Sequence, residues 1–223
     1  MPTAVITGAN RGLGLEFVRQ LMDSNWTVYA ICRTPSKELQ ALQPAQVFVG
    51  DVRSQSDIQT VFESIQGSID VLINNAGIAD GRWPTLEDVD WDVALDVLHV
   101  NAVAPMMVTQ TALPLLRKAD NPCVAMVTSL MGSIADCHSG RSYAYRASKT
   151  ALNMFTAAAR NELQNSGIRS VLLHPGWVKT DMGGQNAPVD VTTSVAGMLD
   201  QIHSTSIEHS GRFVEYTGAI LPW

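Results

Sequence analysis

Residues 3–14 read TAVITGANRGLG, a short β-branched run followed by a glycine-rich turn. The run Thr3–Thr7 is continuously apolar at its centre, which is typical of a strand covered on both faces of a parallel sheet. Apolar residues then recur at helical spacing from Gly12 to Ser24. Glycines between a strand and a helix let backbone N–H groups approach a pyrophosphate at the positive end of the helix. The stretch therefore predicts a phosphate-binding turn, although such a turn can also need glycines for its geometry alone.

The alternation of strands and helices continues along the chain. Further strands are expected at Trp26–Ile31, Gln46–Val49, Val71–Ile73, Cys123–Val127 and Ser170–Leu173, with a closing edge strand at Arg212–Tyr216. Helices are expected at Ser56–Ile65, Trp91–Leu116 and Tyr143–Gln164. This order predicts an α/β fold, a doubly wound Rossmann-type domain whose mostly parallel sheet of about seven strands has helices on both faces. A chain of 223 residues supports one sizeable core, so residues 1–223 are expected to form a single dinucleotide-binding domain.

Composition narrows the class of protein further. The net charge of −6 excludes an overall basic surface, so neither nucleic acid nor an anionic membrane is an expected partner. The three cysteines have no metal-ligand spacing, which predicts reduced thiols and no metal site. No apolar stretch approaches the length of a membrane span, and the N-terminus lacks the pattern of a signal peptide. We therefore expect a cytoplasmic protein.

The glycine spacing is G-x-x-x-G-x-G and resembles the T-G-x-x-x-G-x-G turn of the short-chain dehydrogenase/reductase family. The family's other motifs follow in order, as Asn74-Asn75-Ala76-Gly77, Asn101, Ser129, the Y-x-x-x-K motif Tyr145–Lys149, Pro175-Gly176 and Thr180. The resemblance spans Thr3 to about Met182 and includes the closing stretch Phe213–Trp223. Within the family, the chain is most similar to the carbonyl-reductase-like and C-factor-like branch. The stretches that carry this similarity are Ala9–Gly14, Ser142–Lys149 and Leu221-Pro222-Trp223.

A tyrosine and a lysine form the predicted catalytic pair. Residues four apart on a helix share one face, and a nearby ammonium lowers the pKa of a phenol. Tyr145 has Lys149 four residues on, whereas Tyr143 has Ala147 there, so the spacing selects Tyr145. By resemblance, Asn101 holds a water that links Lys149 to solvent; alternatively, Asn101 is a polar residue hydrogen-bonded in the core.

Ser129 is the candidate for polarising a substrate carbonyl, because it follows the predicted strand Cys123–Val127 at the edge where open α/β sheets bind ligands. In the family the serine most often lies closer to the tyrosine. The greater distance here indicates an insertion in the loop Met131–Arg141, and Ser133 stays an alternative.

The end of the second strand predicts the cofactor. An acidic residue there would bind a ribose 2′-hydroxyl and favour NAD, but the chain has Cys32 followed by Arg33. Arg33 and Arg11 can hold a 2′-phosphate by charge-assisted hydrogen bonds, which predicts NADP(H). The resemblance implies adenine contacts from Asp51-Val52 and a nicotinamide contact from Thr180. The full predicted cofactor set is Gly8, Asn10, Arg11, Gly12, Leu13, Gly14, Arg33, Asp51, Val52, Asn75, Ala76, Gly77, Tyr145, Lys149, Pro175, Gly176, Val178 and Thr180.

These features predict an NADP(H)-dependent oxidoreductase that reduces an aldehyde or ketone by hydride transfer, with Tyr145 as proton donor. The alternative is a dinucleotide-binding, C-factor-like signalling protein with little turnover. A sugar-nucleotide epimerase of the longer branch is disfavoured, because few residues follow Pro175. The substrate loop is expected at about residues 181–190, with Gly183–Pro188 mobile.

Two further expectations concern partners and histidines. The resemblance implies a homodimer or homotetramer formed through the helices Trp91–Leu116 and Tyr143–Gln164, acting on a small-molecule carbonyl substrate. His99, His138 and His174 have no carboxylate or cysteine at meaningful spacing, so they are interpreted as structural or surface residues.

Overall fold

A single parallel sheet organises the computed structural model, which describes residues 1–43, 45–81 and 83–223. Within that part of the chain the sheet has seven strands in the order β3-β2-β1-β4-β5-β6-β7, and each neighbouring pair is parallel. The strands are β1 (Thr3–Thr7), β2 (Thr27–Cys32), β3 (Gln46–Val49), β4 (Val71–Asn74), β5 (Cys123–Val127), β6 (Arg169–His174) and β7 (Arg212–Glu215). The doubly wound α/β fold is confirmed, with β7 at one edge. The strand order reverses between β1 and β4, where such sheets leave a crevice at the carboxyl ends of their strands.

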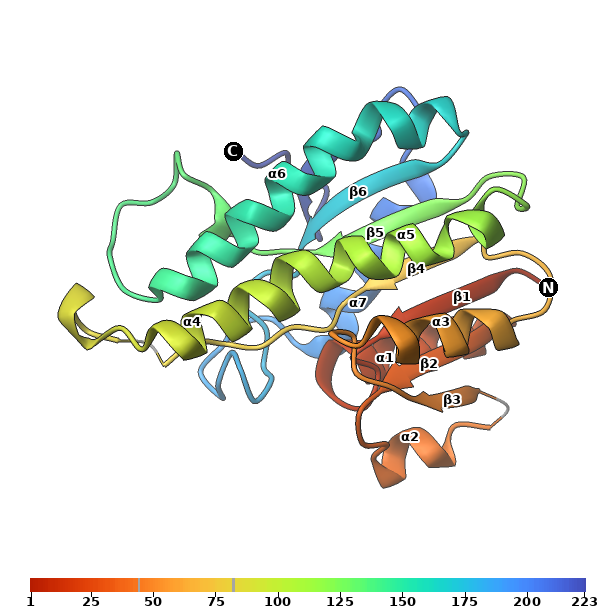
Figure 1. Ribbon diagram of the computed structural model, residues 1–223, viewed down its shortest axis with the longest axis horizontal. Helices are drawn as coiled ribbons and strands as arrows, with labels where there is room; N and C mark the ends of the chain where they lie inside the picture. The colour runs from red at the N-terminus through yellow and green to blue at the C-terminus, as the bar shows by residue number, and fades with distance from the viewer. Residues whose placement is uncertain (44, 82) are drawn as a thin grey trace.

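Helices cover both faces of the sheet (Figure 1). They are α1 (Gly12–Asp23), α2 (Lys37–Ala41), α3 (Gln55–Ser64), α4 (Trp91–Leu98), α5 (Ala104–Leu116), α6 (Tyr143–Asn165) and α7 (Val191–Ser204). Along β1, Ala4 and Ile6 pack with the core on the side of α1 and α7, whereas Val5 packs with the core of α3, α5 and α6. Because both sides of each central strand are buried, the strands are apolar throughout and do not alternate.

Helix α7 was missing from the predicted elements, although its sequence contains a helical signal. Val195, Met198, Leu199 and Ile202 recur at helical spacing and are buried. Asp190 caps the helix, accepting a hydrogen bond from the Thr193 N–H at 2.7 Å. The other predicted helix and strand ends agree with the structure to within about one or two residues, the usual uncertainty of such boundaries.

The helix predicted at Trp91–Leu116 is continuous but changes its winding in the middle. A π-helical turn, η2 (His99–Val103), separates α4 from α5. The expectation that no apolar stretch approaches the length of a membrane span is wrong for Trp91–Leu116, which by length and composition is long and apolar enough to cross a membrane. Half of its most apolar window is buried inside the fold. The π turn contains Asn101, which is fully buried. Turns of this kind are frequent at functional sites, because they reorient one side chain within a helix.

Candidate active site

A large cleft opens at the carboxyl ends of the strands. Its volume is about 1080 Å³, and every residue predicted for cofactor binding lines it, as do Ser129, Tyr145 and Lys149. Asn101 is not among the lining residues. The cleft is large enough for an extended dinucleotide with space for a small substrate, since ligand pockets typically measure about 300–1,000 Å³.

The glycine turn and the end of β4 are joined across the crevice. The hydroxyl of Thr7 accepts hydrogen bonds from the N–H groups of Asn75 and Ala76, both at 3.1 Å. The Asn75 amide nitrogen in turn donates to the carbonyl oxygens of Thr7 and Gly8, at 3.0 and 3.1 Å. These bonds fix the distance between the two walls of the cleft at the point where the strand order reverses.

Two glycines are required by the geometry of this turn. A Cβ at Gly14 would lie 2.1 Å from the Gly8 carbonyl oxygen, so no larger residue fits without moving the backbone. Gly12 has a φ of +53°, in the left-handed region, and the nearest atom to its added Cβ is in Thr180 at 3.6 Å. Gly14 is therefore required for close packing against Gly8, and Gly12 leaves space for a cradle at the N-terminus of α1. The cradle suits the diphosphate of a dinucleotide.

Ser129 and Tyr145 meet in the cleft. Ser129 follows β5 and caps the 3₁₀ turn η3 (Leu130–Gly132), with its hydroxyl accepting from the Met131 N–H at 3.1 Å. The same side chain is hydrogen-bonded to Tyr145. Ser133 lies outside the residues lining the cleft, and its hydroxyl donates to the Trp223 carbonyl oxygen at 3.2 Å. The geometry therefore favours Ser129 over Ser133 as the serine that contacts a substrate.

Trp223 holds the loop that follows Ser129 at a second point. Its carbonyl oxygen also accepts a hydrogen bond from the Ala135 N–H at 2.9 Å, and its indole lies 5.9 Å from the ring of Phe213 between centroids. Residues far apart in sequence are thus joined behind the candidate catalytic serine.

Lys149 is buried beneath Tyr145. Its Nζ donates to the Val127 carbonyl oxygen at 2.9 Å and lies 5.8 Å from the centroid of the Tyr145 ring. Burial lowers the pKa of Lys149 to about 8. The pKa of Tyr145 is raised, first by burial and further by the Asp80 carboxylate, against a lowering by the hydrogen bond with Ser129. The expectation that Lys149 lowers the pKa of Tyr145 is therefore wrong for this structure, because burial dominates and the amine is directed to a backbone carbonyl.

Asn101 joins the π turn to two other parts of the site. Its Oδ1 accepts from the Ile78 N–H at 2.9 Å, and its Nδ2 donates to the Ile78 carbonyl at 2.9 Å and to the Ser148 hydroxyl at 3.0 Å. A Cβ at Gly77 would lie 3.4 Å from Asn101 Oδ1 and 3.7 Å from Lys149 Nζ. The Nδ2 group therefore uses both of its N–H donors within the core, while Oδ1 accepts the hydrogen bond from Ile78 and approaches the same small residue as the lysine.

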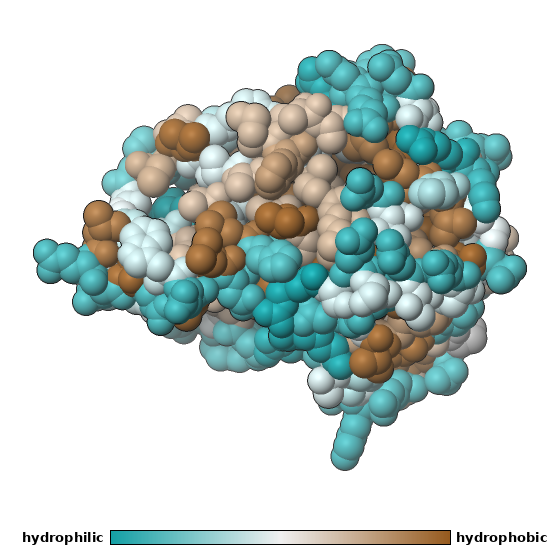
Figure 2. Space-filling model, in the orientation of Figure 1, coloured by the Kyte–Doolittle hydropathy of each residue, from teal (hydrophilic) through white to brown (hydrophobic). Residues whose placement is uncertain are grey.

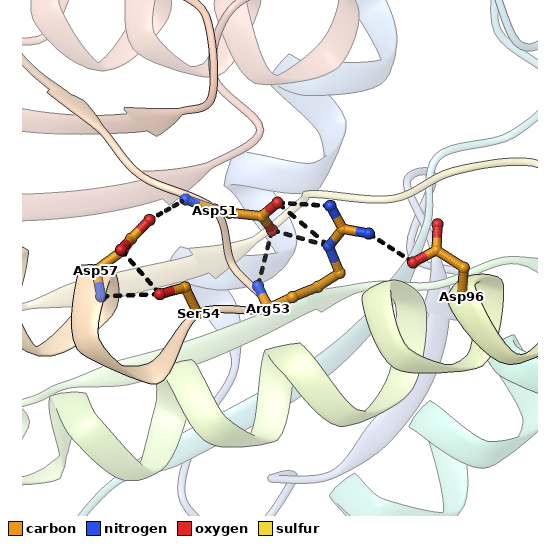
Figure 3. A network of polar contacts seen from close by, with 5 residues as sticks. All are labelled: Asp51, Arg53, Ser54, Asp57 and Asp96. Carbon is orange, nitrogen blue, oxygen red and sulfur yellow. Dashed lines mark hydrogen bonds and ion pairs between the residues drawn. The ribbon is translucent and has the colours of Figure 1, made fainter.

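Charged residues surround the predicted adenine end of the cleft, and Figure 3 shows their arrangement. Arg53 bridges two carboxylates, with Nη2 2.6 Å from Asp51 Oδ2 and Nη1 2.6 Å from Asp96 Oδ1. The Asp51 N–H donates to Asp57 Oδ2 at 3.0 Å. Sequence reasoning missed Arg53, since its partner Asp96 lies on α4, far along the chain. The network holds Asp51 in place from both sides.

The two arginines predicted to bind a 2′-phosphate have different surroundings. Arg33 is exposed and lines the cleft next to the buried Cys32. Arg11 pairs with Asp181 in the loop after Thr180, with 2.6 Å between Nη1 and Oδ2. Both side chains of this pair are more than 70% exposed, so it contributes little to stability. Arg33 and Arg11 thus both present a cation to the cleft.

The loop that contains Gly183–Pro188 is attached at its base. The Trp177 indole N–H donates to the Gly183 carbonyl at 2.7 Å, and the Gly183 N–H donates to the Thr180 hydroxyl at 3.0 Å. A bridge between Val178 and Val189 closes the loop. These bonds place Met182 and Gly183 at the wall of the cleft.

Histidines also lie at the cleft. His138 and His174 are among its lining residues. The sequence indicates structural or surface positions for them, and it does not predict that they line the cleft. Burial lowers the pKa of His174, against a raising effect of Glu215. Within the described ranges 1–43, 45–81 and 83–223, no group of three His, Cys, Asp or Glu residues is arranged to hold a metal ion.

Known proteins resemble this chain over its whole length. The profile of the family described as short chain dehydrogenase matches residues 2–190. C-signal from Myxococcus xanthus is 48% identical over 157 residues, which cover 70% of this chain and 94% of that protein. The NADPH-bound carbonyl reductase from chicken fatty liver superposes with a TM-score of 0.92 at 34% identity, covering 100% of this chain and 99% of that one. Carbonyl reductase Sniffer of D. melanogaster superposes with a TM-score of 0.94 at 33% identity, covering 100% of both.

The Asp51–Arg53 contact predicts a dependence of stability on pH. The hydrogen bond from Arg53 is the main cause that lowers the pKa of Asp51 in the folded state. Its stabilisation is therefore present above the ordinary carboxyl pKa of about 3.9 and is lost as the pH falls through the lower folded value. We expect the free energy of unfolding to decrease below about pH 4, and we expect Arg53→Met to flatten that decrease. Urea unfolding between about pH 3 and pH 6 measures both. The exposed Arg117→Met is the control, and equal slopes for Arg53→Met and the native protein would contradict the prediction.

Proposed function

The chain belongs to the short chain dehydrogenase family, and we propose that it is an NADP(H)-dependent reductase of aldehydes or ketones. The observation that carries this proposal is the content of one cleft. Ser129, Tyr145 and Lys149 meet at one part of it. Arg11 and Arg33 also line it, and Arg33 directly follows Cys32, where an NAD-binding protein would have an acid. Structures of the same fold that contain NADP(H), including the chicken reductase, support the choice of cofactor.

The residues of the cleft suit this cofactor. The cradle at Gly12 would hold its diphosphate, Arg33 and Arg11 its 2′-phosphate, and Asp51-Val52 its adenine. Lys149 would bind the nicotinamide ribose and Thr180 the carboxamide, as the family resemblance implies. The remaining proposed contacts are Gly8, Asn10, Leu13, Gly14, Asn75, Ala76, Gly77, Pro175, Gly176 and Val178. When bound, NADPH supplies the hydride that the carbonyl carbon accepts.

The side chains around Tyr145 would polarise the carbonyl and supply the proton that completes its reduction. The Ser129 hydroxyl would donate a hydrogen bond to the carbonyl oxygen, where negative charge develops as the carbon is reduced. Tyr145 then gives its phenolic proton to that oxygen and completes the alcohol. The raised pKa of Tyr145 keeps the phenol protonated at neutral pH, the form that a proton donor needs. Asn101 would hold the water that returns a proton by way of Lys149.

The proposal extends to the organisation of the protein. Residues 1–223 would act as one dinucleotide-binding domain with residues 181–190 as the substrate loop, in the cytoplasm. Figure 2 shows apolar surface over the helices of the front face. Val103, Met154 and Phe155 are exposed and belong to the two helical stretches predicted to associate. These helices would form the interface of a homodimer or homotetramer.

A second candidate function is a dinucleotide-binding signalling protein with little turnover. The observation that favours it is the relative named C-signal, which is 48% identical to this chain. A pure binding protein has no need of the contact between Ser129 and Tyr145 above a buried lysine, so the reductase is preferred. Tight binding of NADPH without turnover of any carbonyl in a broad panel would reverse this preference.

Cofactor preference tests the role of Arg33. Arg33→Ala removes one charge-assisted partner of the 2′-phosphate, which should weaken NADPH binding by about 1.5–3 kcal/mol and leave NADH binding unchanged. Fluorescence titration of both cofactors gives the two dissociation constants. Lys37→Ala, an exposed cation beyond the same strand, is the control and should change neither. Equal affinities of the native protein for NADPH and NADH would contradict the prediction.

The two candidate serines can be separated by substitution. Ser129→Ala should lower kcat by about 10²–10³-fold, the usual loss of one oxyanion donor, and leave NADPH binding intact. Ser133→Ala should mainly lower the midpoint of thermal unfolding, because its hydroxyl contacts the Trp223 carbonyl and not the cleft. Steady-state rates and melting curves of both variants decide the matter. If Ser133→Ala has the larger effect on kcat, the assignment of Ser129 is wrong.

Tyr145→Phe tests the proton donor itself. The change deletes one hydroxyl, so folding and NADPH binding should persist while carbonyl reduction falls by about 10²–10⁴-fold or more. Tyr143→Phe is the matched control two residues earlier on α6, and it should be far milder. NADPH oxidation measured with one substrate from a panel of aldehydes, ketones and quinones gives the rates. Normal turnover by Tyr145→Phe would exclude the mechanism proposed here.

A further inference from the structure

The helix that holds Tyr145 and Lys149 begins in an unusual way. Its N-cap residue Ser142 has a φ of +50° and makes no side-chain hydrogen bond to the first turn. The first N–H groups of a helix need acceptors from outside the helix. At α6 one acceptor comes from another part of the chain, because Asp80 Oδ2 lies 3.1 Å from the Tyr145 backbone nitrogen. A distant carboxylate thus takes the place of a local cap.

Asp80 lies in the segment that follows β4 and leads away from Asn75, Ala76 and Gly77. It is 9% exposed and lines the same cleft as Tyr145. A carboxylate at a helix N-terminus interacts favourably with the helix dipole. The hydrogen bond therefore fixes the position of Tyr145 relative to the wall that is proposed to bind the nicotinamide.

We propose that Asp80 is a positioning residue that caps α6 at Tyr145 and brings a negative charge to the residue proposed to donate the proton. This inference rests on the proposed function, because it concerns the same acid. A negative charge in the neighbourhood of a phenol disfavours the phenolate, so Asp80 raises the pH at which Tyr145 ionises. The Asp80 charge contributes to the raised pKa of Tyr145.

Other charged groups near Tyr145 come from several elements. Lys149 and Arg146 lie on α6, Asp136 and His138 come from the loop before it, and His174 ends β6; all line the cleft. Lys149 directs its amine to the Val127 carbonyl. Among the carboxylates that line the cleft in the described part of the chain, Asp80 is the one hydrogen-bonded to the backbone of Tyr145 itself.

The test removes the charge and keeps the cap. Asp80→Asn retains an oxygen that can accept a hydrogen bond from the Tyr145 N–H. Asp90→Asn is the matched control, because Asp90 caps the neighbouring helix α4 in the same way. Its carboxylate accepts hydrogen bonds from the N–H groups of Asp92 and Val93. The measurement is kcat against pH for oxidation of the product alcohol with NADP⁺. In Asp80→Asn the ionisation assigned to Tyr145 should move to lower pH by about 0.3–1 unit, less than the roughly 1–3 units of a charge in direct contact. Oxidation on the acidic side of that ionisation should rise by about 2–10-fold, which is the same shift expressed as a rate.

An unshifted profile in folded Asp80→Asn, or an equal shift in Asp90→Asn, would overturn the proposal. If Asp80→Asn fails to fold, Asp80→Ser supplies a short neutral acceptor for the same measurement. If the native protein turns over no substrate, the proposed function fails. The role of Asp80 can then still be tested by measuring tyrosinate absorbance. Alkaline titration of the native protein and of Asp80→Asn, each compared with its Tyr145→Phe counterpart, reports the Tyr145 ionisation without turnover. A lower value in Asp80→Asn then supports the inference, and equal values refute it.

Discussion

The hydrogen bonds between Thr7 and Asn75 are the constraint on which the cleft depends. They join the ends of β1 and β4, the two central strands between which the order of the sheet reverses. A Cβ at Gly8 would lie 2.8 Å from Ala76 Cα, so these two walls already touch at their closest point. The glycine turn therefore has one position relative to the β4 loop. The segment from Asn75 to Asp80 passes from this contact to the N-terminus of α6, and the proposed phosphate and proton-transfer ends of the cleft share one rigid wall.

The fold was predictable because its signals are local. Each strand is a short apolar run, and parallel strands bring their carboxyl ends to one edge, so residues that follow strands, such as Gly12 and Ser129, were expected to lie at one cleft. Features created by tertiary contacts were not predictable. The partners of Arg53 and Asp80 are distant in sequence, and the π turn at Asn101 has the same apolar periodicity as an ordinary helix. The direction of the Tyr145 pKa shift was also missed, because burial is not visible in the spacing of two residues.

Charge in this acidic protein is arranged locally. Two exposed cations of the cleft are the proposed partners of the 2′-phosphate, Arg33 and Arg11, and Arg11 is paired at the surface with Asp181. The proton-transfer end is different, because Lys149 is buried and has a pKa of about 8. One end thus attracts an anion from solvent, while the other keeps ionisable groups out of water, where small changes in their surroundings alter their protonation.

The contact of Trp223 with Ser133 and Ala135 has a consequence for the order of folding during synthesis. The elements that hold the glycine turn precede Trp223 in the chain, and a domain generally folds as one unit. The loop behind Ser129, however, lacks two of its hydrogen bonds until residue 223 has left the ribosome. The loop beside the candidate catalytic serine is therefore anchored only when the chain through residue 223 is available, so this part of the site becomes ordered together with the closing segment of the domain.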